Sequence, residues 1–132
     1  MAQADKIVGT YDVASPFNSD KAHVKITKTS KGTYQGRIVW TSRTKNDDGT
    51  PVCDIQNPDP KLRNRKPEEI IMVWNLSYED GEWVGGTLYD PYSGKKFSVK
   101  FKLDKNNKDL KARYYKGVPA AGINAVWKRL EK

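Results

Sequence analysis

Short stretches in which apolar and polar residues alternate recur along the whole chain, and most of them end in a turn signal. Between Lys95 and Leu103, for example, two phenylalanines, a valine and a leucine alternate with lysines and a serine. A period of two places successive side chains on opposite faces of a strand, so this rhythm is typical of an all-β domain. It predicts eight strands: Ile7–Val13, Ala22–Thr29, Thr33–Thr41, Glu69–Ser77, Glu82–Tyr89, Lys95–Leu103, Leu110–Tyr115 and Ile123–Leu130.

Short turns join most of these strands in sequence order. Ser30-Lys31-Gly32 follows the second strand, and Glu79-Asp80-Gly81 is a hairpin turn of the Asp-Gly type. Strands in meander order, without a convincing helix, favour an eight-stranded antiparallel up-and-down barrel, which has no open sheet edge. The interior of such a barrel is either filled by side chains or holds one small ligand.

The alternation stops between residues 42 and 67, a stretch that contains four of the seven prolines. We therefore expect one long loop after the third strand. Connections longer than about 12–15 residues are usually functional or disordered, so this loop is a candidate for carrying function.

Composition supports one domain with its own core. The chain has 132 residues, of which 36% are hydrophobic, and four Trp, seven Tyr and three Phe supply large side chains for burial. No apolar run approaches the roughly 18 residues of a membrane-spanning helix. Because Cys53 is the only cysteine and His23 the only histidine, an intrachain disulfide and a cysteine-based metal site are excluded.

The first residues suggest export. Ala2-Gln3-Ala4 has the small-x-small form that signal peptidases leave behind. Our hypothesis is that Met1 replaces a removed signal peptide, and that the protein is periplasmic or secreted. An ordinary frayed terminus is the alternative. In either case we expect residues 1–6 to be flexible and residues 7–132 to form a single β-barrel domain.

The formal net charge of +8 is confined to one predicted hairpin. Residues 95–116 contain nine basic and two acidic groups, a net charge of +7, whereas the rest of the chain carries +1. This hairpin either keeps an exposed face soluble or contacts an anionic envelope surface. Nucleic acid is not favoured as a partner, because the aromatic residues expected to stack on bases alternate with the lysines and lie on the opposite face.

Few residues suit catalysis or metal binding. Asp47-Asp48-Gly49, with Asp54 and Asp59 nearby, offers oxygen ligands for calcium, but the spacing of an EF-hand loop is absent and these residues are ordinary turn formers. The chain lacks a P-loop, a dinucleotide fingerprint and a nucleophile elbow. We therefore predict no metal, no cofactor and no enzymatic activity.

Two further groups of residues stand out. Asn57-Pro58-Asp59-x-x-Leu62-Arg63-x-Arg65 places two arginines in the long loop, where they either clamp a carboxylate or phosphate or pair with neighbouring acids to order the loop. Gly9-Thr10-Tyr11 lies in the first predicted strand, and Trp127-Lys128-Arg129 lies in the last. The first and last strands of a closed barrel are neighbours, so a stacked aromatic and cation would close one end.

Several of these segments resemble a known bacterial family. They are Tyr34-x-Gly36-Arg37-Ile38-Val39-Trp40, the Asn57–Arg65 segment, Trp83-x-Gly85-Gly86-Thr87-Leu88-Tyr89-Asp90-Pro91-x-x-Gly94-Lys95, Leu110-x-Ala112-Arg113-x-Tyr115-x-Gly117 and Trp127-x-Arg129. In this order they are similar to the domain-of-unknown-function 2147 family of small exported bacterial proteins. The resemblance implies a lipocalin-like, calycin-type barrel with a signal peptide, and it carries no activity with it.

The function predicted from these observations is binding of a small hydrophobic or amphipathic molecule. Seven aromatic residues are expected to line the interior: Tyr34, Trp40, Trp74, Tyr89, Phe97, Phe101 and Tyr114. Four arginines are candidates to hold a carboxylate or phosphate at the mouth: Arg37, Arg63, Arg65 and Arg113. A barrel filled by its own side chains, and an envelope interaction protein that uses residues 95–116, remain the alternatives.

Overall fold

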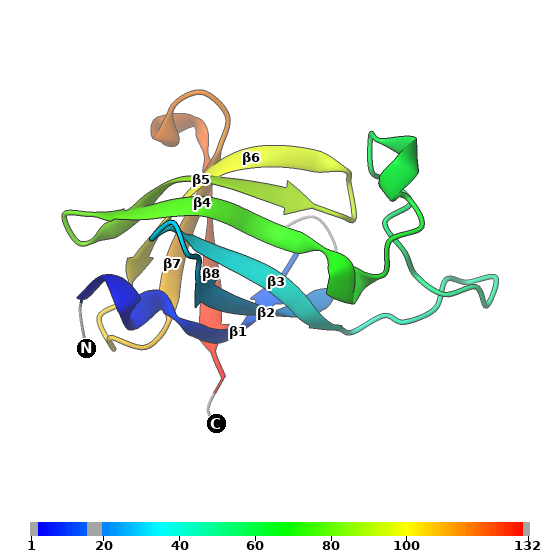
Figure 1. The fold of residues 1–132 in the computed structure, drawn as a ribbon, viewed down its shortest axis with the longest axis horizontal. Helices are drawn as coiled ribbons and strands as arrows, with labels where there is room; N and C mark the ends of the chain where they lie inside the picture. Colours follow the sequence, from blue (N-terminus) through cyan, green and yellow to red (C-terminus); the bar gives the residue numbers. More distant parts are fainter. Residues whose placement is uncertain (1–2, 16–19, 131–132) are drawn as a thin grey trace.

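The computed structural model describes residues 3–15 and 20–130 and contains a closed barrel of antiparallel strands (Figure 1). Each strand pairs with the next in sequence, and the last pairs with the first. The strands are β1 (Gly9–Ala14), β2 (Lys21–Lys28), β3 (Tyr34–Thr41), β4 (Ile71–Glu79), β5 (Glu82–Asp90), β6 (Lys95–Leu103), β7 (Leu110–Tyr115) and β8 (Ile123–Arg129). Four short 3-10 helices are η1 (Gln3–Ile7), η2 (Pro60–Leu62), η3 (Pro67–Glu69) and η4 (Pro119–Ala121).

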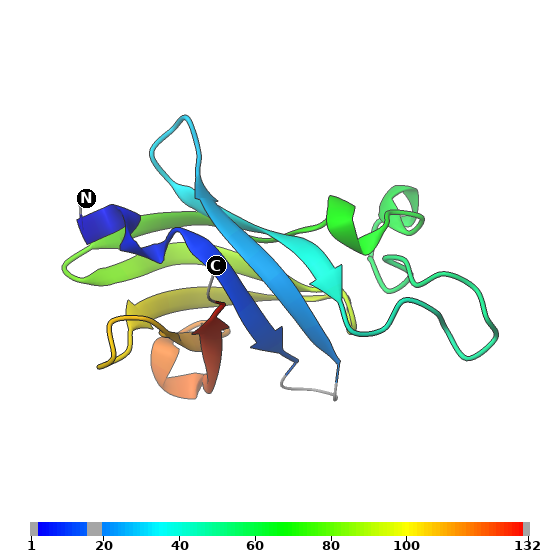
Figure 2. The same ribbon diagram turned by 90° about the horizontal axis from the view of Figure 1, so that it is seen from below.

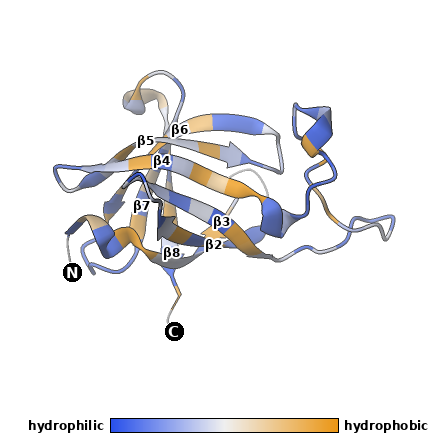
Figure 3. Cartoon of the chain, in the orientation of Figure 1, coloured by the Kyte–Doolittle hydropathy of each residue, from blue (hydrophilic) through white to orange (hydrophobic). Residues whose placement is uncertain are grey.

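The predicted fold class is confirmed. All eight predicted strands are present, with ends displaced by no more than two residues, and the long loop follows β3. Hydrophobic and hydrophilic residues alternate along the strands (Figure 3). In β7, Leu110, Ala112 and Tyr114 are buried, and the residues between them are more exposed. Local alternation therefore set the faces of this strand as expected.

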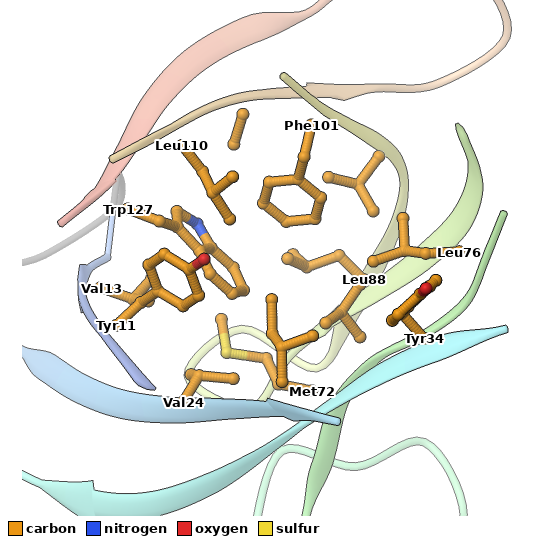
Figure 4. Close-up of a cluster of buried hydrophobic side chains, with 14 of the residues drawn as sticks. Tyr11, Val13, Val24, Tyr34, Met72, Leu76, Leu88, Phe101, Leu110 and Trp127 are labelled. Carbon is orange, nitrogen blue, oxygen red and sulfur yellow. The ribbon is translucent and has the colours of Figure 1, made fainter. Parts of the chain in front are cut away.

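The barrel interior is filled by aromatic and aliphatic side chains that point inward from facing strands (Figure 4). The largest fully buried side chains include Trp83, Trp127, Tyr11, Tyr34, Tyr114 and Phe101. The Phe101 ring meets the edge of Trp127 at a centroid distance of 4.7 Å. Burying each such side chain contributes roughly 1.5–3 kcal/mol to folding, so these contacts dominate the stability of the barrel.

One end of the barrel is closed by η1. Ile7 is fully buried, the Trp83 indole N–H donates to the Ala4 carbonyl at 2.9 Å, and the Tyr11 hydroxyl donates to the Ile7 carbonyl at 2.8 Å. Of the segment 1–6 that was expected to be flexible, residues 3–6 belong to η1, and the Ala4 carbonyl accepts a hydrogen bond from a core side chain. Residues 1–2 lie outside the described part.

Arg129 reinforces the same end. Its guanidinium donates to the carbonyls of Lys6, Val8 and Lys108 and lies 4.9 Å from the centroid of the Tyr11 ring. This is the cation and aromatic pair predicted between the first and last strands. The cation binds backbone carbonyls and a ring face at once, so it ties η1 to both strands.

The opposite, open end carries the long loop. The connections that follow odd-numbered strands, such as β3–β4 and β5–β6, lie at this end of the barrel. The β3–β4 connection is the long loop, which projects from the barrel in two views (Figures 1 and 2). The loop touches the β5–β6 turn closely. A Cβ atom on Gly94 would lie 2.0 Å from the Gln56 carbonyl oxygen, and the backbone of Gly94 has a positive φ of 74°. Only glycine fits this approach.

Irregular pairing turns two predicted interior residues outward. The pairing of β2 with β3 shifts between His23 and Val24, where β3 contains one extra residue, Val39. Because of this bulge in β3, Trp40 is 44% exposed and stacks on His23 at 4.4 Å instead of facing inward. Trp74 lies next to an irregular region of β4, where Asn75 has a positive φ of 65°. It lines an external groove with Gln35. The interior placement predicted for these two tryptophans is wrong, because a bulge reverses the alternation.

Candidate functional site

The barrel interior leaves little free space. At the open end, the interior side chains enclose a hollow of about 20 Å³ beside Ile38, Leu88 and Tyr114, which is room for about one water molecule. Of the residues predicted to line a chamber, Tyr34, Phe101 and Tyr114 instead fill the core. The interior of the described barrel thus matches the filled alternative.

A larger pocket lies between the long loop and the open end of the barrel. We call it the mouth pocket. Its volume is about 220 Å³, and its lining residues are Ile38, Thr41, Arg43, Asn46, Val52, Cys53, Ile55, Gln56, Pro67, Ile70, Pro91 and Tyr92. It shares Ile38, Pro91 and Tyr92 with the small interior hollow, so the two spaces are neighbours.

A buried carboxylate pins the long loop to the barrel wall. Asp54 is fully buried and accepts hydrogen bonds from the Arg65 guanidinium at 2.6 Å, the Asn57 amide at 2.8 Å and the Tyr89 hydroxyl at 2.6 Å. Tyr89 follows the inward-facing Leu88 and therefore points outward, where the loop covers it. The interior position predicted for Tyr89 is wrong, and its burial comes from the loop.

Hydrogen bonds within the Asn57–Arg65 segment hold its conformation. The Asn57 side-chain oxygen accepts from the Asp59 amide at 2.8 Å, and Asp59 caps η2 by accepting from the Lys61 amide at 3.0 Å. The Arg63 guanidinium donates to the Asn57 carbonyl at 2.8 Å. Both loop arginines thus bind groups of the loop itself, which is the second of the two roles predicted for them.

Burial keeps the tyrosines near the long loop protonated. It raises the pKa of Tyr92 to about 12. It also raises the pKa of Tyr89 well above the usual tyrosine range, and the hydrogen bond to Asp54 adds to this shift. Both phenols are neutral at ordinary pH, so they serve as hydrogen-bonding groups and not as bases.

Three of the predicted site residues meet outside the barrel. Arg65, Trp74 and Tyr89 line a groove of about 610 Å³ between the loop and the outer face of the sheet, which we call the outer groove. Its other lining residues are Gln35, Asn57, Pro58, Asp59, Leu62, Ile71 and Lys96. The signal in the sequence was the Asn57–Arg65 motif, but only the folded loop brings it to Trp74.

The remaining predicted residues are dispersed. Arg37 is exposed on β3, and Arg63 lies in the loop. Arg113 donates to the Pro119 carbonyl and the Asn124 side chain, both at 2.8 Å, and so braces the β7–β8 loop. Phe97 is partly buried against the core, with the Lys116 ammonium 5.3 Å from its ring centroid. The prediction that the arginines meet at the mouth is wrong, because their strands and loop point them in different directions.

None of the predicted site residues lines the mouth pocket. Arg43 and Tyr92 are the two missed residues that matter most for its chemistry. Arg43 follows β3 directly and pairs with Asp20 at 3.3 Å. Tyr92 belongs to the β5–β6 turn, which was treated as a turn signal only. A basic residue at the start of a long loop was the available signal for Arg43, whereas Tyr92 needed the three-dimensional arrangement.

The outer face of β6 and β7 concentrates positive charge. We call Lys100, Lys102, Lys111 and Arg113 the basic face. The strand register places Lys100 opposite Arg113 and Lys102 opposite Lys111, an arrangement of like charges that is destabilising in itself. The Glu82 carboxylate lies 3.4 Å from the Lys100 ammonium, and the Asp104 carboxylate lies 3.8 Å from the Lys111 ammonium. These two acids compensate only part of the repulsion among the four cations.

No group of three or more His, Cys, Asp or Glu side chains in residues 3–15 and 20–130 is arranged to hold a metal ion. Within the same ranges, no helix has the length and apolarity needed to cross a membrane.

Comparison with known proteins gives one structural relative. The chain is similar to protein HP1028 from the human pathogen Helicobacter pylori, which is described as belonging to the lipocalin family. The TM-score is 0.77 at 25% identity, covering 96% of this chain and 84% of that protein. The barrel of this chain is thus lipocalin-like. A search of curated proteins found no match. A family model described as "Uncharacterized protein conserved in bacteria (DUF2147)" matches residues 9–129, so the chain belongs to this bacterial family.

Proposed function

We propose that this protein binds a small amphipathic molecule in the mouth pocket. A lipocalin-like barrel suggests ligand binding. Because the interior is filled, the pocket at the open end is the better candidate for the binding site. The observation that carries the proposal is that the 220 Å³ mouth pocket and the hollow at the open end of the barrel share Ile38, Pro91 and Tyr92 as lining residues. Its volume is close to the lower end of the roughly 300–1,000 Å³ of small-molecule sites.

The lining supports a molecule with an apolar part and an anionic head. Ile38, Val52 and Ile70 provide apolar surface, and Arg43 provides a cation. The Arg43 side chain is 45% exposed, so its ion pair with Asp20 contributes little. A bound carboxylate, sulfonate or phosphate replaces this pair at low cost.

The test measures binding of anilinonaphthalene sulfonate and its displacement by decanoate. Arg43→Gln and Ile55→Glu each weaken dye binding by about tenfold or more, because they remove the cation or place a charge among apolar atoms. Arg37→Gln and Val118→Glu are matched controls, since Val118 and Ile55 are both 60% exposed. Equal losses in the controls, or no binding by the wild type, contradict the proposal.

We further propose that the protein acts without catalysis, in the periplasm or outside the cell. The single histidine and the Ala2-Gln3-Ala4 sequence support these points. Fractionation of the native host tests the location, and a purely cytoplasmic protein would refute it. Native mass spectrometry with lipid extraction of envelope-purified protein identifies the retained molecule, and recovery of a chemically converted product would speak for an enzyme.

A second candidate function is contact with an anionic envelope surface through the basic face. The like-charge pairs Lys100–Arg113 and Lys102–Lys111 support it, because an anionic partner relieves their repulsion. Co-sedimentation with phosphatidylglycerol vesicles across a salt series tests this function. Reversing the charges of Lys100, Lys102 and Lys111 should abolish binding, whereas reversing Lys21, Lys25 and Lys31 should preserve it; equal effects eliminate the candidate.

A further inference from the structure

The outer groove has an aromatic floor that is separate from the mouth pocket. Trp74 on β4 is paired with Thr87 on β5, two residues before Tyr89, so the two rings are diagonal neighbours on the outer face of the sheet. Tyr89 is held in place by its hydrogen bond to Asp54, whereas Trp74 is only partly buried. The floor therefore offers an ordered apolar surface about the size of one ring.

One cation at this floor is available to a ligand. Lys96 lies opposite Tyr89 in the register of β5 and β6, and its side chain is exposed. Within the described residues, the Lys96 ammonium has no ion-pair partner, whereas Arg65 is already bound to Asp54 at 2.6 Å. A carboxylate in the groove would form a charge-assisted hydrogen bond with Lys96.

The rim of the groove carries both donors and acceptors. Gln35 on β3 lines it, and among the described residues no hydrogen bond engages its amide, which offers two donors and an acceptor. Asp59 lines the rim from the loop, with one carboxylate oxygen accepting from the Lys61 amide. Groups of these two kinds pair with hydroxyls, which both donate and accept.

We propose that the outer groove binds an acidic sugar, with its ring on Trp74, its carboxylate on Lys96 and its hydroxyls at Gln35 and Asp59. The C–H face of a sugar ring is apolar and covers an aromatic ring, while its edge remains polar. An aromatic acid would fit the floor but would leave Gln35 and Asp59 without partners. The chemistry of the rim thus selects a hydroxylated ring.

The test is an NMR titration of the full chain with glucuronate, glucose and benzoate. Glucuronate shifts the indole N–H signal of Trp74 and the amide signal of Lys96 saturably. Glucose, which lacks the carboxylate, and benzoate, which lacks the hydroxyls, each bind about tenfold more weakly. Absence of saturable shifts with glucuronate, or equal affinity for benzoate, overturns the proposal.

Paired variants locate the site. Trp74→Ala abolishes saturable glucuronate binding, Trp74→Phe retains part of it, and Lys96→Gln weakens it about tenfold. Trp40→Ala and Lys25→Gln remove an exposed tryptophan and an exposed lysine elsewhere and leave binding unchanged. Arg43→Gln in the mouth pocket also leaves it unchanged, which separates this site from the proposed function. Equal losses in these three variants overturn the proposal.

Discussion

At the scale of single residues, one buried carboxylate organises the long loop. Burial of an unpaired charge is costly, yet Asp54 is fully buried because a guanidinium, an amide and a phenol each donate to it. Two of these donors come from the loop and one from β5. The loop is thereby ordered without an extensive apolar core of its own.

Replacing Arg65 tests this arrangement. Arg65→Met leaves Asp54 buried without its cation and is expected to lower the free energy of unfolding by about 3–5 kcal/mol. Arg63→Met removes one hydrogen bond at an exposed position and is expected to cost about 0.5–1.5 kcal/mol. Urea denaturation of the two variants measures both values, and similar losses would contradict the central role of Asp54.

The buried tyrosines predict a loss of stability at alkaline pH. Burial raises the pKa of Tyr11 to about 12 from its ordinary value of 10.0, so the folded state favours the protonated phenol. The resulting stability is complete below about pH 10 and is lost as the pH rises through about 12. Ultraviolet titration and circular dichroism measure tyrosine ionisation and unfolding together. In the Tyr11→Phe variant, the loss of folding stability at alkaline pH should be smaller than in the wild type. An unchanged dependence of stability on pH would show that the Tyr11 phenol does not cause the loss.

At the scale of elements, bulges and register decide which side chains meet. The bulge in β3 moves Trp40 to the surface, and the register of β6 and β7 places cations directly opposite one another. Neither effect follows from the composition of a single strand. Both alter surface chemistry while the barrel remains closed.

Charge on β8 tests the effect of the basic face. Val126 is 50% exposed and lies opposite Lys111. Relative to Val126→Gln, Val126→Glu should raise the free energy of unfolding by about 0.2–1 kcal/mol and Val126→Lys should lower it by a similar amount. Denaturation at low salt measures the difference, which should nearly vanish at about 1 M salt. Two variants of equal stability at low salt would show that the basic face is not under repulsion.

At the scale of the whole molecule, the barrel is a packed core closed at one end and covered by a pinned loop at the other. Side chains of the interior pack directly against the backbone of Gly36. A Cβ atom there would lie 2.7 Å from a Val24 methyl and 2.9 Å from a Val73 methyl. The described interior therefore leaves little room for a ligand.

Gly36→Ala tests how tightly the interior is filled. The added methyl group overpacks the core, and the expected loss is about 1–3 kcal/mol in the free energy of unfolding. Val24→Ala removes one of the colliding methyls, so combining the two substitutions should cost less than the sum of the single losses. Thermal or urea denaturation of the three variants measures these losses. If the loss in the double variant equals the sum of the two single losses, the core has spare room at Gly36.

The sequence by itself determined the strands, their order, the closed barrel and the contact of an aromatic residue with a cation between the first and last strands. These features depend on alternation, turn residues and neighbouring strands, which are local or follow directly from closure. The family resemblance was also carried by short motifs, and the match over residues 9–129 confirms it. The presence of a long loop was readable from its prolines.

Only the tertiary structure decided where the candidate site lies. Bulges turned Trp40 and Trp74 outward, and the folded loop brought Arg65 to Asp54 and Tyr89. The physical reason is that alternation fixes a side chain's face only while the register is regular, whereas loop contacts join residues far apart in sequence. Whether an eight-stranded barrel is open or filled depends on the summed volumes of its interior side chains. Alternation indicates which residues face inward, but it does not determine how completely they fill the interior.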